Sequence, residues 1–121
     1  MAQTSYLHKR RTPRFAFSAE AEIKLRDGKS LPAQISELSA RGCYVDTLEF
    51  VPLGEELELS ICDPTNVCEV HGKVIYEHSG GGLGMVGMGV VFGEMNEQQH
   101  STIDLWLRQA SGEPTDAAIP N

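Results

Sequence analysis

The 121-residue chain is long enough for one domain around a single modest core, and its 17 acidic and 10 basic side chains give a formal net charge of −7. This charge disfavours a protein that follows nucleic-acid phosphates, so no DNA or RNA partner is expected. No apolar run reaches the length of about 18 residues that a membrane-spanning helix needs, and the first residues lack the apolar centre of a signal peptide. The sequence therefore predicts a cytoplasmic protein that does not enter a membrane. Its cysteines are expected to be reduced and mostly packed: Cys43, Cys62 and Cys68.

Positive charge gathers in residues 9–14, which we call the arginine arm. Its four basic residues are Lys9, Arg10, Arg11 and Arg14. The arm carries +4, and the rest of the chain has 17 acidic against 6 basic side chains. Arginine holds phosphates and purine edges through its planar set of donors, and Pro13 favours an extended backbone here. The arm therefore predicts an anion-binding segment, with a solvated basic terminus as the simpler alternative.

Two strands joined by a hairpin are predicted after the arm. Apolar and polar residues alternate from Ala19 to Leu25 and again over residues 30–37, as in half-buried strands. Asp27 and Gly28 between them form a favoured hairpin turn. Pro32 indicates an edge or a bulged position in the second strand.

A polar kink is predicted at residues 37–42, between the second strand and a third that begins near Cys43. Gly42 can adopt a positive φ or allow close backbone approach, and Ser39 can bond its own turn or a ligand. Tyr44 faces away from the apolar side of the third strand. The kink is thus a second candidate site beside the arm.

Three further strands are predicted at residues 57–61, 68–76 and 85–92. In the fifth strand one apolar face is expected to contain Cys68, Val70, Val74 and Tyr76. In the sixth, Gly87 and Gly89 leave one face nearly bare, which would let another segment lie close to the sheet. Six short strands at regular spacing predict an all-β fold, a small antiparallel barrel over residues 15–93.

One helix is predicted at residues 96–110. Asn96 and Gln99 form a capping box, and an apolar stripe follows at helical spacing: Ile103, Trp106, Leu107 and Ala110. The helix is expected to plug or flank the barrel. Residues 1–8 are predicted to be flexible, and residues 111–121 to be a disordered tail.

Enzymatic and metal chemistry are not predicted. Cys68 and His71 have a ligand-like spacing, but they should point to opposite faces of one strand. The glycines of residues 80–84 lack the Lys-Ser/Thr ending of a phosphate loop. The histidines are scattered along the chain: His8, His71, His78 and His100. No metal or cofactor is therefore expected, and the protein is not expected to be an enzyme.

The arm and the kink together resemble the ligand motifs of the PilZ domain family. The resemblance consists of Arg10-x-x-x-Arg14 before the first strand, Ser39 and Gly42 in the kink, and the strand at residues 87–92. It covers about residues 9–110. It implies a six-stranded antiparallel PilZ-type barrel that binds the bacterial second messenger cyclic di-GMP without catalysis.

The resemblance also implies roles for single residues. Arg10 and Arg14 would reach phosphates and guanine, with Arg11 adding charge, while Ser39 and Gly42 would form the barrel half of the site. The family usually has Asp or Asn where this chain has Glu37. Glu37 keeps a carboxylate acceptor but moves it by about one bond length.

Two functional hypotheses follow. The first is a second-messenger sensor in which cyclic di-GMP orders the arm on the barrel and the ordered surface recruits a protein partner. The alternative is a ligand-independent PilZ-like interaction module in pilus or motility assembly, which Glu37 favours. A weaker third hypothesis, binding of single-stranded nucleic acid, requires exposed aromatic residues beside a basic groove.

Overall fold

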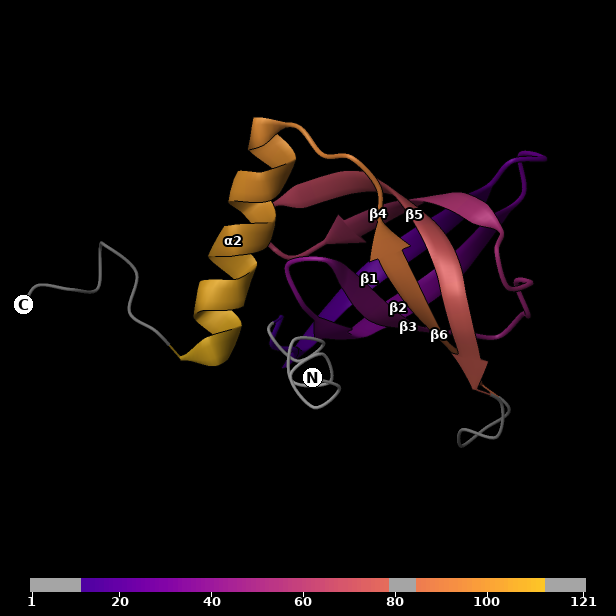
Figure 1. The fold of residues 1–121 in the computed structure, drawn as a ribbon, viewed down its shortest axis with the longest axis horizontal. Coiled ribbons are helices and arrows are strands. Elements are labelled where there is room, and N and C mark those ends of the chain that lie inside the picture. Colours follow the sequence, from indigo (N-terminus) through magenta and orange to yellow (C-terminus); the bar gives the residue numbers. More distant parts are fainter. Residues whose placement is uncertain (1–11, 79–84, 113–121) are drawn as a thin grey trace, which may run out of the picture.

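The computed structural model describes residues 12–78 and 85–112 and shows a closed antiparallel barrel with one helix (Figure 1). The elements are β1 (Phe15–Leu25), β2 (Ser30–Leu38), β3 (Gly42–Thr47), β4 (Glu56–Cys62), β5 (Val67–His78), β6 (Val86–Phe92) and α2 (Glu97–Ser111). Around the barrel the strands follow the order β1-β2-β3-β6-β5-β4. The predicted six-stranded barrel with a C-terminal helix is confirmed.

Several sequence predictions fall outside the described residues. They concern the flexible segment 1–8, the arm residues 9–11, the glycine-rich connection 79–84 and the tail from residue 113 onward. Arg10 and Arg11 are among them, so Arg14 is the member of the candidate arginine set that the structure places.

The core lies inside the barrel, and the alternation of each strand explains it. Every second side chain points inward, so the apolar set of each strand meets the others around the barrel axis. The residues with 0 or 1 % exposure in the strands are Ile23, Ile35, Leu38, Val45, Leu57, Leu59, Ile61, Val70, Val74 and Met88. Burial of one such side chain contributes about 1.5–3 kcal/mol.

Two strand boundaries differ from the predicted ones. β1 begins at Phe15 and not at Ala19, and the alternation of its burial runs unbroken from Phe15 although its pairing with β2 shifts between Ala16 and Ala19. β2 continues to Leu38, a fully buried residue that the sequence placed in the polar kink. The turn between β2 and β3 is therefore shorter than predicted.

Tyr76 is not in the core, so that prediction is wrong. β5 also has a register shift, where Val74 pairs with Val90 of β6 but Tyr76 pairs with Gly89. Ile75 is the extra residue, and after it the alternation is reversed. Ile75 is 52 % exposed and Tyr76 is 36 % exposed, so both lie on the outer surface.

The helix α2 packs across one end of the barrel, against β1 and β5 (Figure 1). The predicted capping box is present, and Gly112 ends the helix in the left-handed conformation at φ 81°. Trp106 is fully buried with its ring centroid 5.3 Å from that of Phe17, and its Nε1 donates to Asp63 Oδ2 at 2.7 Å. The helix thus flanks the barrel and covers its end.

The cysteines are free thiols. Cys43 and Cys68 are buried as expected, whereas Cys62 at the end of β4 is exposed. Burial raises the pKa of the Cys43 thiol, so it stays protonated. Within residues 12–78 and 85–112, no helix is long and apolar enough to cross a membrane.

Candidate functional site

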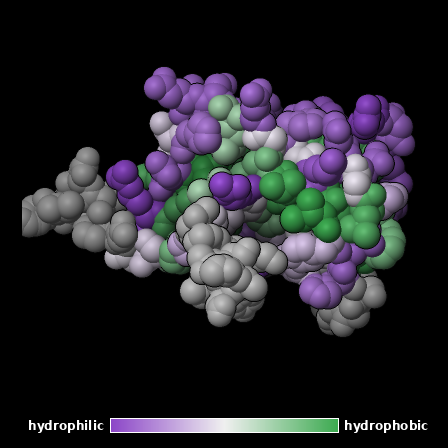
Figure 2. All heavy atoms as spheres, viewed as in Figure 1, coloured by the Kyte–Doolittle hydropathy of each residue, from purple (hydrophilic) through white to green (hydrophobic). Residues whose placement is uncertain are grey.

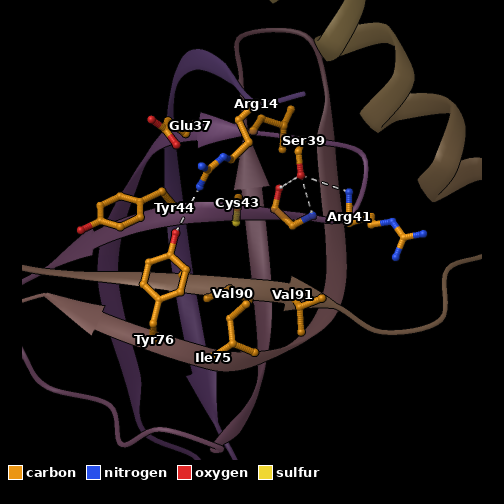
Figure 3. Close-up of a pocket in the computed structure, with 13 residues that line it drawn as sticks. Arg14, Glu37, Ser39, Arg41, Cys43, Tyr44, Ile75, Tyr76, Val90 and Val91 are labelled. Atoms are coloured by element: carbon orange, nitrogen blue, oxygen red, sulfur yellow. Dashed lines mark hydrogen bonds between the residues drawn. The ribbon is translucent and has the colours of Figure 1, made fainter. Parts of the chain in front are cut away.

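The candidate site is a pocket of about 250 Å³ on the outer face of the barrel, where the end of β2, the start of β3, the last part of β5 and the middle of β6 meet (Figure 3). Its wall is formed by Arg14, Glu37, Leu38, Ser39, Arg41, Gly42, Cys43, Tyr44, Ile75, Tyr76, Gly89, Val90 and Val91. Figure 2 shows apolar surface on this side of the molecule, over β5 and β6. The pocket is therefore a mainly apolar hollow with a polar rim.

Gly42 allows β3 to approach β6. A Cβ at this position would overlap the carbonyl oxygen of Val90, so no larger residue fits without moving the backbone. Of the two roles that the sequence left open for Gly42, close approach is the one observed, since its φ is not among the positive glycine angles. Gly42 thereby shapes one wall of the pocket.

The hydroxyl of Ser39 organises the turn before Gly42. It accepts from the backbone N–H groups of Arg41 (3.2 Å) and Gly42 (3.1 Å), and it donates to the carbonyl of Gly42 (3.2 Å). A serine hydroxyl has one donor and two acceptor positions, and all three are engaged here. Ser39 is only 7 % exposed. In this structure it bonds its own turn.

Arg14 and Glu37 supply charge at the rim of the pocket, and both side chains are exposed. Arg14 precedes β1, and its Nη1 lies 3.5 Å from the hydroxyl of Tyr76. Figure 3 shows its guanidinium pointing toward the two tyrosines. The last pairs of β2 with β3 place Glu37 opposite Tyr44. The rim therefore carries a cation and an anion beside aromatic rings.

Tyr44, Tyr76 and His78 form a cluster that we call the aromatic trio. Their ring centroids are 6.0–6.2 Å apart, a spacing typical of interacting aromatic rings. The Tyr44 hydroxyl and His78 Nδ1 are 3.1 Å apart and share a hydrogen bond. Desolvation raises the pKa of Tyr44, and the nearby Asp46, Tyr76 and Glu37 raise it further. Tyr44 is thus a neutral hydrogen-bonding group at the site.

The two tyrosines lie on the bare face of β6. A Cβ at Gly87 would overlap the Tyr44 ring, and a Cβ at Gly89 would overlap the Tyr76 ring. The sequence predicted that another segment would lie close here, and side chains from the neighbouring strands β3 and β5 occupy this face instead. Glycine at both positions leaves room for an aromatic ring directly against the sheet.

The structure brings together four of the predicted site residues at one pocket: Arg14, Glu37, Ser39 and Gly42. Sequence reasoning missed Tyr44, Tyr76 and Arg41 as part of the site. The outward position of Tyr44 next to the bare glycine face was a usable signal. Tyr76 gave none, because the bulge that exposes it leaves no mark in the residue pattern.

The remaining chemical candidates lie elsewhere. Cys68 is buried and His71 is exposed, as their alternation predicted. His71 lies between two carboxylates, with Nδ1 2.9 Å from Glu58 Oε2 and Nε2 3.2 Å from Glu56 Oε1. Within the part of the chain that the structure describes, no group of His, Cys, Asp and Glu could hold a metal ion.

The chain forms a closed six-stranded barrel with a helix after the last strand and a pocket on its outer face. The PilZ domain family model matches residues 8–109, and the chain therefore belongs to the PilZ domain family. The resemblance drawn from the arm, the kink and the last strand is confirmed. A comparison with curated proteins gave no match.

Solved structures share the fold at low sequence identity. The PilZ domain of YcgR from Escherichia coli, solved with c-di-GMP, has a TM-score of 0.68 and 15 % identity over 86 % of this chain and 95 % of that one. A longer YcgR chain from Escherichia coli, also in complex with c-di-GMP, has a TM-score of 0.73 and 13 % identity, and the match covers 86 % of this chain and 46 % of that one. The inhibitor of motility MotI/DgrA from Bacillus subtilis has a TM-score of 0.70 and 16 % identity, and the match covers 88 % of this chain and 53 % of that one. This chain spans about half the length of the latter two.

Proposed function

We propose that this protein is a bacterial second-messenger sensor that binds cyclic di-GMP between the arginine arm and the barrel pocket. The observation that carries the proposal is the placement of Arg14 and Glu37 at the rim of one apolar pocket. Family membership supports it, as do the YcgR structures, which contain c-di-GMP. The ligand would be bound and not transformed.

The chemistry of the rim suits this ligand. Cyclic di-GMP carries two phosphate charges and two guanines, and a guanidinium can bond either a phosphate or the O6 and N7 acceptors of guanine. The N1–H and N2–H donors of guanine suit a carboxylate such as Glu37. Arg10 and Arg11 would add charge from the arm. Ser39 and Gly42 would contribute by shaping the turn that forms the pocket wall.

The signal would pass to a protein partner through ordering of the arm. The arm carries +4 and the remaining chain is acidic, so a dianionic ligand changes the electrostatic balance between them. The ordered arm and ligand would then form a new surface for the partner.

Calorimetric titration of the full chain with cyclic di-GMP tests the proposal, with GTP and cyclic GMP as control ligands. We expect saturable binding of cyclic di-GMP that weakens as salt is raised, because the contacts are between charges at an exposed site. Failure of cyclic di-GMP to bind at low salt, or equal binding of all three nucleotides, would overturn it.

The alternative function is a ligand-independent interaction module in pilus or motility assembly. The loop between β3 and β4 favours it, because Val51 anchors this loop in the core while Leu48, Phe50 and Leu53 are 59–66 % exposed. Exposed apolar side chains on a fixed loop are a common feature of interaction surfaces. Glu37 in place of Asp or Asn also favours this function. A chain that captures a partner equally with and without cyclic di-GMP would support it.

A further inference from the structure

A surface outside the pocket has no role in ligand binding. The loop between β3 and β4 exposes three large apolar side chains, which we call the loop patch: Leu48, Phe50 and Leu53. We infer that the loop patch is the docking surface for a protein segment that has an apolar face flanked by lysine or arginine side chains. The inference goes beyond the proposed function, because it names the chemistry of the partner and holds whether or not cyclic di-GMP binds.

The conformation of the loop directs these side chains outward. Glu55 N donates to the Pro52 carbonyl at 3.1 Å and closes a tight turn. Its third residue, Gly54, has φ 85°, the left-handed conformation that this position requires, so Leu53 is held at the tip of the turn. Val51 is fully buried and anchors the preceding part of the loop in the core. The exposure of Leu53, 60 %, is thus a consequence of a defined backbone.

The loop is also joined to both of its neighbours. Gly54 N donates to the Val74 carbonyl at 2.8 Å, and Val74 N donates to the Glu55 carbonyl at 3.0 Å, which joins the turn to β5. On the other side, Lys29 Nζ lies 2.8 Å from Glu49 Oε1 and connects the loop to the β1–β2 hairpin. A surface whose backbone is already fixed loses little conformational entropy when a partner binds.

Other occupants suit the loop patch less well. Three such side chains can cover roughly 300–400 Å², which is below the area of about 800 Å² per partner in a stable interface between folded subunits. A second copy would also bring another net charge of −7, and the same charge opposes contact with an anionic membrane surface. A few apolar anchors instead suit a short segment whose own apolar face packs against them.

The charge of the chain determines what should flank that apolar face. Outside the arginine arm, the chain has 17 acidic against 6 basic side chains. Two carboxylates, Glu49 and Glu55, belong to the loop itself, and Lys29 pairs with the former while both side chains of that pair stay about half exposed. Lysine or arginine beside the apolar face of the partner would therefore be attracted, and acidic residues would be repelled.

The loop patch lies near the ligand pocket. The turn is bonded to β5 at Val74, and the next residue, Ile75, is 52 % exposed and lines the pocket. Figure 2 shows apolar surface that continues from β5 and β6 toward the end of the barrel opposite α2, where the β3–β4 loop lies in Figure 1. A segment docked on the loop patch would therefore lie close to the place where we propose that the ligand binds.

A defined peptide tests the chemistry of the loop patch. The probe is a fluorescently labelled amphipathic helix of about 18 residues, or about five turns, with a leucine face and lysine flanks. It is titrated with the full chain in the absence of cyclic di-GMP, and fluorescence anisotropy reports binding. A peptide with the same leucines and with glutamate in place of lysine is the control ligand. We expect saturable binding of the lysine peptide, about tenfold or more tighter than that of the glutamate peptide.

Matched variants locate the binding on the protein. Phe50→Ser removes the aromatic anchor of the loop patch and should weaken binding of the lysine peptide about tenfold or more. Val67→Ser is the control, because Val67 is 60 % exposed, as Phe50 is at 59 %, but lies beside the helix at the start of β5. It should bind like the wild type. Both side chains are exposed, so neither variant should change the thermal transition.

Amide chemical shifts provide a readout that does not depend on a variant. Titration of the wild-type chain with the lysine peptide should shift the amide resonances of residues 48–55 and leave those of the helix at residues 97–111 unchanged. If Phe50→Ser should lose its cooperative thermal transition, these shifts and the variant Leu48→Ser decide. Shifts confined to other residues, together with unchanged affinity in Leu48→Ser, would then contradict the inference.

Several results would overturn the inference. They are absence of saturable binding of the lysine peptide, equal binding of the two peptides, and unchanged affinity in a folded Phe50→Ser variant. A dimer in solution that Phe50→Ser converts to a monomer would assign the loop patch to a second copy, and binding to phosphatidylglycerol vesicles that Phe50→Ser abolishes would assign it to a membrane. None of these measurements contains cyclic di-GMP, so their failure leaves the proposed function standing, and failure of cyclic di-GMP to bind leaves this inference standing.

Discussion

Two regions of this barrel use aromatic residues differently. At the helix end, the Trp106 ring is fully buried against Phe17, and its N–H bonds a carboxylate. At the pocket, Tyr44 and Tyr76 lie outside the barrel on glycines. The first arrangement closes the fold, and the second leaves ring surface beside charged side chains. The comparison separates residues that stabilise the domain from residues that are available to a ligand.

The polar groups of the two regions also differ in how firmly hydrogen bonds within the fold hold them. Desolvation would raise the pKa of Asp63, but hydrogen bonds from the backbone of Thr65 and Asn66 and from Trp106 outweigh it and lower the pKa. The Asp63 carboxylate is thus committed to the β4–β5 turn and the helix. At the rim of the pocket, the hydrogen bond that Arg14 makes among the described residues is a long one to Tyr76, so an anion can replace this contact at small cost.

The largest expected effect is at the helix end. Trp106→Ala removes a fully buried ring and should lower the free energy of unfolding by about 3–5 kcal/mol. Denaturant unfolding followed by circular dichroism measures this change. Tyr76→Ala is the comparison at the pocket and should change stability by only about 0.5 kcal/mol. A similar loss in both variants would erase the distinction between the two regions.

The next effect is on binding alone. Arg14→Ala removes a charge-assisted contact and should weaken cyclic di-GMP binding about ten- to a hundredfold, with unchanged stability. Arg26→Ala in the β1–β2 hairpin removes the same charge away from the pocket and should have little effect. Equal losses in both variants would mean that net charge and not the position of Arg14 determines affinity.

Glu37 should have a smaller effect than Arg14. Glu37→Ala loses the guanine contact and should weaken binding by less than Arg14→Ala does. Glu37→Asp keeps the carboxylate and should change affinity modestly, in either direction, because only its reach differs. If Arg14→Ala binds normally while Glu37→Ala does not, the kink and not the arm anchors the ligand.

The smallest effect is a pH dependence on the outer face of β4 and β5. The hydrogen bond from Glu58 raises the pKa of His71, desolvation opposes this, and Glu56 adds to the rise. The resulting stabilisation is full below the unfolded pKa of about 6.5 and is lost as pH rises through the folded value. It should not exceed about 1 kcal/mol, because the pairs are exposed to solvent. His71→Gln should remove this dependence in denaturant unfolding measured between about pH 5 and 8, whereas binding of cyclic di-GMP should not change.

Most of the fold could be predicted from the sequence, because the alternation of apolar and polar residues indicates which side chains of a barrel strand point inward. The prediction failed where the alternation breaks. The bulge at Ile75 reversed the face of Tyr76, which the pattern of β5 had placed in the core. Bulges depend on pairing with the neighbouring strand, which a single strand's pattern does not contain.

The candidate site was predicted only in part for a related reason. The arm and the kink are short motifs, and they identified Arg14, Glu37 and Gly42 as neighbours of one pocket. The tyrosines come from β3 and β5, which are far apart in the sequence and meet only across β6. Their pairing with Gly87 and Gly89 follows from strand order and register, and these appear only in the folded chain.

Amide hydrogen exchange of the full chain, with and without cyclic di-GMP, tests the central claim most directly because it locates the ligand. Bound ligand should slow exchange in residues 37–44 and 89–91, which contribute to the pocket wall, and leave the helix at residues 97–111 unchanged. Protection confined to the helix end, or saturating ligand without any change at the pocket, would contradict the assignment of this pocket as the cyclic di-GMP site.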